Sequence, residues 1–176
     1  MPHGFTLVLE DHADRPFATA TALKSAVRMM AAPMGPTYIM LKDPYGGYAQ
    51  AAGFDDRFRI EMREVYGEGF RHWLAGSPSV KDRSDVVMYY RNRCHIHGTR
   101  RCPLPAWGEN VLPLSAVLTI VSHYHSTGAR LAAYPWEDVS QSFIDEGLKG
   151  KSRFIRRIRP RTRTREREQS IEGGEG

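Results

Sequence analysis

The sequence predicts one α+β domain, in which two main helices pack on one face of a mostly antiparallel sheet. Three observations lead to this prediction. Hydrophobic residues recur at helical spacing in two segments, several short segments are apolar or alternate as strands do, and turn-like segments separate the middle strands. Because turns of hairpin length join antiparallel neighbours, the strands between the two helices should pair in that way.

The first expected elements are a strand and a helix. Residues 5–9 form a short apolar run that is typical of a strand. Residues 19–30 place their apolar side chains on one side of a helix, and Thr19 is a suitable N-cap at its start. The Pro-Met-Gly-Pro sequence at residues 33–36 ends this helix.

The middle of the chain is expected to form a series of strands. They span residues 38–41, 48–52, 58–65, 70–74 and 85–90. The third strand alternates between apolar and charged residues, so we expect one of its faces to be buried and the other exposed. The apolar residues are Phe58, Ile60 and Met62, and the charged residues are Arg59, Glu61 and Arg63. Residues 91–107 fit a strand or a loop equally well.

The strongest helical pattern covers residues 114–126, whose apolar residues form one continuous stripe. Pro113 stands at its start, where a missing backbone N–H has no cost, and Gly128 stands just past its end, as a helix cap requires. A closing strand is expected over residues 131–136, followed by a short helix over residues 139–143.

Charge divides the chain into a body, residues 1–146, and a basic tail, residues 147–176. Residues 1–148 contain 15 Lys and Arg against 16 Asp and Glu, whereas residues 149–176 contain 10 against 4. A nearly neutral body argues against a domain that binds nucleic acid through a basic face. The tail has too little apolar material to form a core, so we expect a disordered, solvated extension. Weak nucleic-acid contact through residues 149–167 is the alternative.

Apolar segments and cysteines bear on the expected location of the protein. No segment approaches the roughly 18 apolar residues that a membrane-spanning helix needs. The first residues, Met-Pro-His-Gly, do not resemble a secretion signal, and two cysteines are too few for a disulfide framework. We therefore expect a cytoplasmic protein that does not associate with a membrane.

The residues that could carry chemistry gather around the two cysteines. The densest group is Cys94, His95, His97 and Cys102, with His123 and His125 further along the chain. The cysteines are eight positions apart, further than the usual spacing in zinc sites, and the two later histidines project in different directions from a helix. We expect no metal, no cofactor, no small-molecule substrate and no enzymatic activity. A metalloenzyme built on this cluster is the alternative.

Standard catalytic motifs are also missing from the sequence. It contains no phosphate-binding glycine loop and no nucleophile elbow. A zinc-dependent nucleobase deaminase requires His-x-Glu and Pro-Cys-x-x-Cys, and the chain contains neither. The protein is therefore not expected to be such a deaminase itself.

Several motifs in residues 111–139 form a recognisable pattern. They are a Leu-Ser helix start, an aromatic residue near the helix end, a Thr-Gly step, and a Trp followed by acidic residues; a glycine-tipped hairpin lies upstream. The positions are Gly46, Gly47, Leu114, Ser115, Tyr124, Gly128 and Trp136. This pattern resembles a bacterial immunity-protein family from polymorphic toxin systems, which is often encoded beside toxins with a nucleic-acid deaminase domain.

The resemblance implies a protein that binds a cognate toxin domain one-to-one and blocks its active site. A deaminase toxin presents a basic groove to nucleic acid, so its inhibitor should offer carboxylates and aromatic side chains. The candidate toxin-binding residues are Asp55, Asp56, Glu61, Glu64, Tyr66 and Glu68, with Glu137 and Asp138 as a second group. Trp136 is expected to anchor the core. The alternatives are an ordinary charged sheet face, and a nucleic-acid-associated regulator that uses the basic tail.

Overall fold

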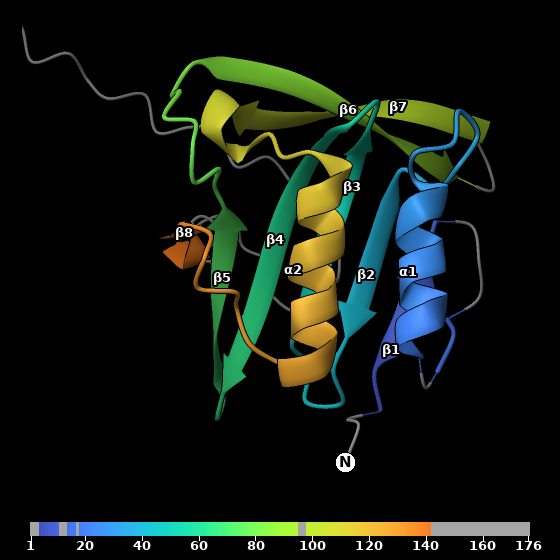
Figure 1. The fold of residues 1–176 in the computed structure, drawn as a ribbon, viewed down its shortest axis with the longest axis vertical. Helices are drawn as coiled ribbons and strands as arrows, with labels where there is room; N and C mark the ends of the chain where they lie inside the picture. The colour runs from blue at the N-terminus through green and yellow to red at the C-terminus, as the bar shows by residue number, and fades with distance from the viewer. Residues whose placement is uncertain (1–3, 11–13, 17, 95–97, 142–176) are drawn as a thin grey trace, which may run out of the picture.

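The computed structural model describes residues 4–10, 14–16, 18–94 and 98–141, and it confirms the predicted α+β fold (Figure 1). Within these residues, six strands form one sheet in the order β1-β2-β3-β4-β5-β8. The strands are β1 (Thr6–Leu9), β2 (Tyr38–Lys42), β3 (Tyr48–Phe54), β4 (Arg57–Tyr66), β5 (Gly69–Ala75) and β8 (Trp136–Asp138). Every neighbouring pair is antiparallel, as predicted, and β2 to β5 are joined by hairpin turns.

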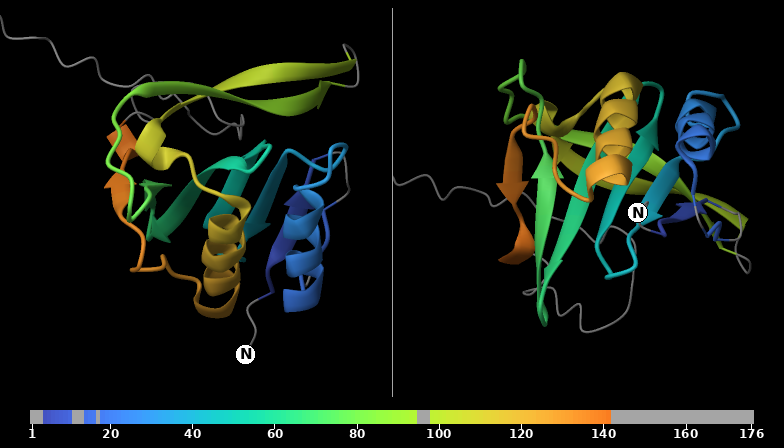
Figure 2. Two further views of the ribbon diagram at one scale, coloured as in Figure 1. Left: turned by 45° about the horizontal axis from the view of Figure 1, so that its top comes forward. Right: turned by 60° about the horizontal axis from the view of Figure 1, so that its bottom comes forward.

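Two helices, α1 (Ala20–Met29) and α2 (Leu114–Thr127), lie side by side on one face of this sheet (Figures 1 and 2). The predicted N-cap of α1 is confirmed, because the Thr19 hydroxyl accepts a 3.1 Å hydrogen bond from the backbone N–H of Ala22. Gly128 ends α2 with a φ of 69°, a left-handed conformation that glycine adopts without steric cost. Neither helix combines the length and the apolar character needed to cross a bilayer, and the same holds throughout the described residues.

The main core lies between the helices and the sheet. It includes Leu7, Leu23, Val27, Ile39, Leu41, Phe58, Ile60, Met62, Val117, Ile120 and Tyr124. Fully burying one large apolar side chain contributes roughly 1.5–3 kcal/mol, so this cluster supplies much of the driving force for folding. The inward face of β4 is the one that its alternating pattern predicts.

A two-stranded ribbon, β6 (Asp85–Cys94) and β7 (Gly98–Trp107), packs on the other face of the sheet (Figure 2). Its side chains form a second, smaller core with β3. This core contains Ala52, Met88, Tyr90, Leu104 and Ala106. Nη1 of Arg59 donates a 2.7 Å hydrogen bond to the carbonyl oxygen of Pro105, which ties the ribbon to β4. A short 3-10 helix, η1 (Gly108–Asn110), leads from the ribbon to α2.

The remaining predicted elements differ in part from those observed. Residues 91–107, for which the sequence favoured neither strand nor loop, belong to the ribbon. The closing strand is shorter than predicted, because residues 132–134 form a turn and β8 begins only at Trp136. The short helix predicted over residues 139–143 extends outside the described residues. The basic tail and its predicted boundary at residues 146 and 147 also lie outside them.

Candidate partner-binding surface

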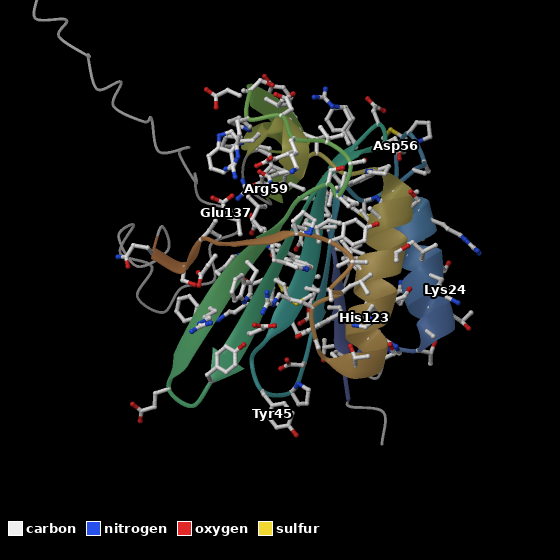
Figure 3. The ribbon with its side chains drawn as sticks, turned by 60° about the vertical axis from the view of Figure 1, so that its left-hand side comes forward. Lys24, Tyr45, Asp56, Arg59, His123 and Glu137 are labelled. Atoms are coloured by element: carbon white, nitrogen blue, oxygen red, sulfur yellow. The ribbon has the colours of Figure 1, made fainter. Side chains whose placement is uncertain are left out.

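The carboxylates predicted to bind a partner do not form one surface. Asp55 and Asp56 make the turn before β4, at one end of that strand. At its other end lie Glu64, Tyr66 and Glu68. Since β4 has 10 residues, its two ends are about 30 Å apart. Figure 3 shows this separation through Asp56 at the upper end of the sheet and Tyr45, on the β2–β3 turn, at the lower end.

Between these two groups, Glu61 is buried, and the prediction that it is exposed is wrong. Its side chain is only 2% exposed, on the sheet face that turns away from the helices. Oε1 lies 2.6 Å from Nη2 of Arg59, and Oε2 accepts a 2.7 Å hydrogen bond from Gln50 and lies 3.2 Å from Nε2 of His72. Those three side chains are buried as well. This polar layer belongs to the interior, because the ribbon covers Arg59 and both faces of β4 are buried here.

The neighbours of Glu61 keep it charged. Burial alone raises the pKa of this carboxyl, but the Arg59 guanidinium and hydrogen bonds to His72 and Gln50 outweigh that effect and lower the pKa to about 2. Glu61 is therefore an anion at neutral pH and neutralises the buried cation of Arg59. Removing one partner from such a buried pair leaves an uncompensated charge and is strongly destabilising.

At the far end of β4, Glu64 is held by three neighbours. Oε1 lies 2.8 Å from Nε of Arg130, while Oε2 accepts hydrogen bonds from the Trp73 indole at 2.8 Å and from the Tyr66 hydroxyl at 2.5 Å. Burial raises the pKa of Glu64, and these hydrogen bonds outweigh burial and lower it below the ordinary value. Glu64 thus has an internal role, whereas Tyr66 and Glu68 are exposed at the β4–β5 turn.

The second predicted group lies on β8, at the edge of the sheet. Glu137 and Asp138 face opposite sides of the sheet, because consecutive strand residues alternate. Oδ1 of Asp138 accepts hydrogen bonds from the backbone N–H and the hydroxyl of Ser140, at 2.9 and 2.5 Å. Glu137 lies 3.6 Å from Arg83. These two residues therefore do not act as one acidic patch.

Gly46 and Gly47, two positions of the family resemblance, lie in the β2–β3 turn. Gly46 has a φ of 91°, and a Cβ at Gly47 would collide with the carboxylate of Asp43. Oδ1 of Asp43 accepts the backbone N–H groups of Tyr45 and Gly47 at 2.8 and 2.9 Å. Both glycines are therefore required by the fold of the turn.

The other positions of the resemblance lie on α2 and β8. The backbone N–H of Leu114 donates a 2.7 Å hydrogen bond to Oδ1 of Asp56, which satisfies the first turn of α2. Ser115 is exposed on that turn. Trp136 is partly buried against the main core, and its indole N–H donates to the carbonyl oxygen of Leu131 at 3.0 Å. Trp136 thus has the anchoring position that the sequence predicts.

A hollow of about 320 Å³ opens beside the β3–β4 turn. We call it the turn hollow; its walls are the loop of residues 30–35, the turn itself and two tyrosines of β6. Met34 in this loop is 79% exposed, and Tyr89 on the ribbon is 40% exposed. Met29 and Val87, which are also exposed, precede these residues on α1 and β6. None of these four residues was predicted from the sequence to bind a partner.

Both aspartates of the turn have a left-handed backbone, with φ of 52° at Asp55 and 56° at Asp56. A two-residue hairpin turn of this kind favours Asn-Gly, and a side chain in this conformation costs roughly 1 kcal/mol or more. Asp56 has a structural role at the start of α2 through Leu114. The exposed carboxylate of Asp55 has no hydrogen bond or ion pair with the described residues. Aspartate is among the residues that such turns tolerate, so the feature that marks Asp55 is its exposed carboxylate in the wall of the turn hollow.

The cysteine cluster is only partly described. Residues 95–97 and the side chains of Cys94 and Cys102 lie outside the description. The ribbon register pairs Cys94 with Gly98 and Cys102 with Tyr90, which separates the two cysteines by four positions, or about 13 Å, along the ribbon. In the part of the chain that the structure describes, no group of three or more His, Cys, Asp or Glu is arranged to hold a metal ion.

The two later histidines lie on α2 and project from it separately (Figure 3 labels His123). Nε2 of His125 is 2.7 Å from the carbonyl oxygen of Ala18, and its ring lies 5.4 Å from that of Phe5. His125 therefore has a packing role between α2 and the N-terminal segment.

Comparison of the chain with protein-family models, with curated proteins and with solved structures found no match. A proposal for its function therefore depends on the residues and surfaces described above.

Proposed function

We propose that the chain is a binding protein of the immunity type, rather than an enzyme, which forms a one-to-one complex with a cognate toxin domain and covers its active site. The observation that carries this proposal is the turn hollow. There, exposed Met34 and Tyr89 lie beside Asp55, whose backbone is left-handed and whose carboxylate has no partner among the described residues. The resemblance of residues 111–139 to an immunity-protein family supports the same function.

The turn hollow has the composition of a protein interface. Methionine and tyrosine are enriched at interfaces, because methionine adapts its shape and tyrosine supplies a large contact area at a low entropic cost. Exposed apolar residues that gather in one place mark interaction sites more often than scattered ones do. Met29, directly before the loop of residues 30–35, and Val87, on the strand that carries Tyr89, are exposed as well.

Asp55 gives this surface a negative centre. A toxin domain that acts on nucleic acid carries a basic groove, and complementary charge accelerates the encounter between partners and fixes their orientation. A basic side chain of the toxin, placed between Met34 and Tyr89 and paired with Asp55, would hold the inhibitor over that groove. The inhibitor would then exclude the nucleic acid from the active site.

The proposal is tested by co-purifying the tagged chain with the C-terminal domain of the toxin encoded beside its gene, and by rescue of cells that express this domain. We expect a stable one-to-one complex in size-exclusion chromatography with light scattering, and restored growth. A domain that kills cells, but neither binds the chain nor is neutralised by it, would overturn the proposed function.

Two sets of variants locate the binding surface. Met34→Glu and Asp55→Lys should each weaken the complex by about tenfold or more, since they place charge in the centre of the interface. Tyr66→Ala and Glu68→Lys, at the opposite end of β4, should change the affinity by less than about twofold. Lys24→Ala, on the exposed side of α1 (Figure 3), controls for a general effect of charge. Loss of binding in the second set alone would move the interface to the β4–β5 turn.

A further inference from the structure

A second hollow, of about 680 Å³, lies next to β8, on the opposite side of the molecule from α1 (Figures 1 and 2). We call it the β8 hollow; its walls are the end of β5, residues 76–83, η1 and residues 135–137. It shares no lining residue with the turn hollow. Its volume is in the range of sites that hold a ligand or a partner's side chain.

Backbone hydrogen bonds hold the walls of the β8 hollow in place. The N–H of Glu109 donates to the carbonyl oxygen of Asp82 at 2.8 Å, and the carbonyl oxygen of Glu109 accepts the N–H of Ser77 at 2.6 Å. A Cβ at Gly108 would collide with the carboxylate of Asp82, so the two walls approach more closely than a side chain allows. These contacts fix the walls relative to each other, so the fold itself determines the shape of the hollow.

Arg83, in the wall of the β8 hollow, contacts two carboxylates and an aromatic ring. Its Nε lies 2.5 Å from Oε1 of Glu109, and its Nη1 lies 3.6 Å from Oε2 of Glu137. The guanidinium also stacks on Trp107, with Cζ 4.5 Å from the ring centroid. Two carboxylates and an aromatic face are groups that proteins use to recognise a guanidinium. An arginine site, occupied by the chain's own Arg83, thus lies at the rim of the hollow, where Glu109 and Glu137 of its wall approach Trp107 outside it.

The two carboxylates hold Arg83 only weakly, and one buried polar atom of the wall has no hydrogen-bond partner among the described residues. Arg83 is 62% exposed, and exposed ion pairs contribute little because water screens them. Asn110 in the wall is 2% exposed, and its Nδ2 donates a 3.0 Å hydrogen bond to the carbonyl oxygen of Ala75, which fixes its amide group. Its Oδ1 has no partner among the described residues.

We propose that the β8 hollow binds an arginine side chain of a partner protein, whose guanidinium exchanges with that of Arg83 between Glu109 and Glu137. Leu74 and Val80 form an apolar wall for the aliphatic stem. A side chain on a docked partner is present at high effective concentration, so it displaces a weakly held internal group. Arginine is required rather than lysine, because a planar guanidinium reaches two carboxylates and stacks on a ring at once.

The probe for this site is the peptide acetyl-Ala-Arg-Ala-amide, titrated into the full chain while NMR follows the indole N–H signals of Trp107 and Trp136. We expect saturable shifts with this peptide and none with the same peptide carrying citrulline, which is uncharged and of similar shape. Agmatine, a free guanidinium compound, should bind no more tightly than the peptide. An equal response to the citrulline peptide, or binding of agmatine about tenfold tighter, would overturn the proposal.

Variants of the hollow test the exchange itself. Arg83→Ala empties the site and should bind the peptide up to about fivefold more tightly, because a weakly held competitor is removed; misfolding cannot produce such a gain. Adding Glu137→Gln to that variant should reverse the gain. Lys81→Ala removes an exposed charge from the same wall and should stay within about twofold of the wild type. An Arg83→Ala protein that binds no more tightly than the wild type would show that Arg83 does not compete for the site.

Discussion

The hydroxyl of Tyr124 donates a 2.8 Å hydrogen bond to Oδ2 of Asp43, so that one carboxylate joins α2 to the β2–β3 turn. The other oxygen of Asp43 holds the turn itself, through the backbone N–H groups of Tyr45 and Gly47. Two positions of the family resemblance, the glycine-tipped hairpin and the aromatic residue near the helix end, are thus parts of one structural unit.

Replacing Tyr124 by Phe should lower the free energy of unfolding by about 1–2 kcal/mol, because the ring keeps its packing while Asp43 loses a donor. Urea unfolding at neutral pH measures this change. Tyr134→Phe is the matched control, since the hydroxyl of Tyr134 has no hydrogen-bond partner among the described residues. Equal losses in the two variants would contradict a specific role for the Tyr124–Asp43 bond.

The same hydrogen bond predicts a loss of stability in alkali. Burial, and then the hydrogen bond to Asp43, raise the pKa of Tyr124 above its ordinary value of 10.0. The unfolded chain therefore ionises this phenol at a pH where the folded protein keeps it protonated. Its contribution to stability is complete below pH 10 and is lost as the pH rises above that value. The stability difference between the wild type and Tyr124→Phe should narrow from pH 9 to pH 11; a constant difference would count against this assignment.

The alternating pattern of β4 predicted one face of that strand and not the other. Phe58, Ile60 and Met62 lie in the main core, as the pattern requires. Arg59 and Glu61 are also buried, because the ribbon reaches Arg59 from 46 positions further along the chain. Two residues that are two positions apart share a strand face, so the sequence places Arg59 and Glu61 on the same side of β4. Their burial does not follow from the sequence, because local periodicity carries no information about a distant segment that covers the polar face.

Replacing Glu61 by Gln should lower the free energy of unfolding by about 3–5 kcal/mol at neutral pH, since it leaves Arg59 buried without a counter-charge. The pKa of Glu61, at about 2, is below its ordinary value of 4.5. Its stabilising effect is therefore complete above pH 4.5 and is lost as the pH falls from 4.5 towards 2. Urea unfolding should show the difference between wild type and variant shrinking over this range.

Glu68→Gln, at the exposed β4–β5 turn, is the control for this substitution and should change stability by less than about 0.5 kcal/mol. If the Glu61→Gln difference were the same at pH 6 and pH 3, another group would have to hold the charge of Arg59.

The turn hollow was only partly predictable from the sequence. Asp55 was a candidate because it belongs to an acidic stretch that was expected to be exposed. Met34 and Tyr89 come from a loop and from the ribbon, and only the tertiary fold brings them beside that turn. A usable signal existed at Met34, which stands in a Pro-Met-Gly-Pro segment that belongs to no periodic element. A large apolar residue in such a segment has no core of its own to join.

Glycine substitutions at Asp55 and Asp56 should distinguish the energetic cost of the left-handed backbone from the role of each side chain. Glycine adopts a φ near 52° without steric cost, so Asp55→Gly should raise the free energy of unfolding by up to about 1 kcal/mol. Asp56→Gly relieves the same strain but removes the hydrogen bond to the N–H of Leu114, so it should lower stability by up to about 1 kcal/mol. Urea unfolding of the two variants, side by side, gives both values.

The affinity of the same two variants for the toxin domain completes the test, because a residue kept under strain for binding should trade stability for affinity. Asp55→Gly should be at least as stable as the wild type and still bind the domain about tenfold more weakly, since the negative centre of the turn hollow is gone. Unchanged affinity would remove Asp55 from the interface. A variant less stable than the wild type by more than about 1 kcal/mol would show instead that the Asp55 side chain supports the fold. The Asp56→Gly protein separates these outcomes, because it alters the same turn and leaves the Asp55 carboxylate in place.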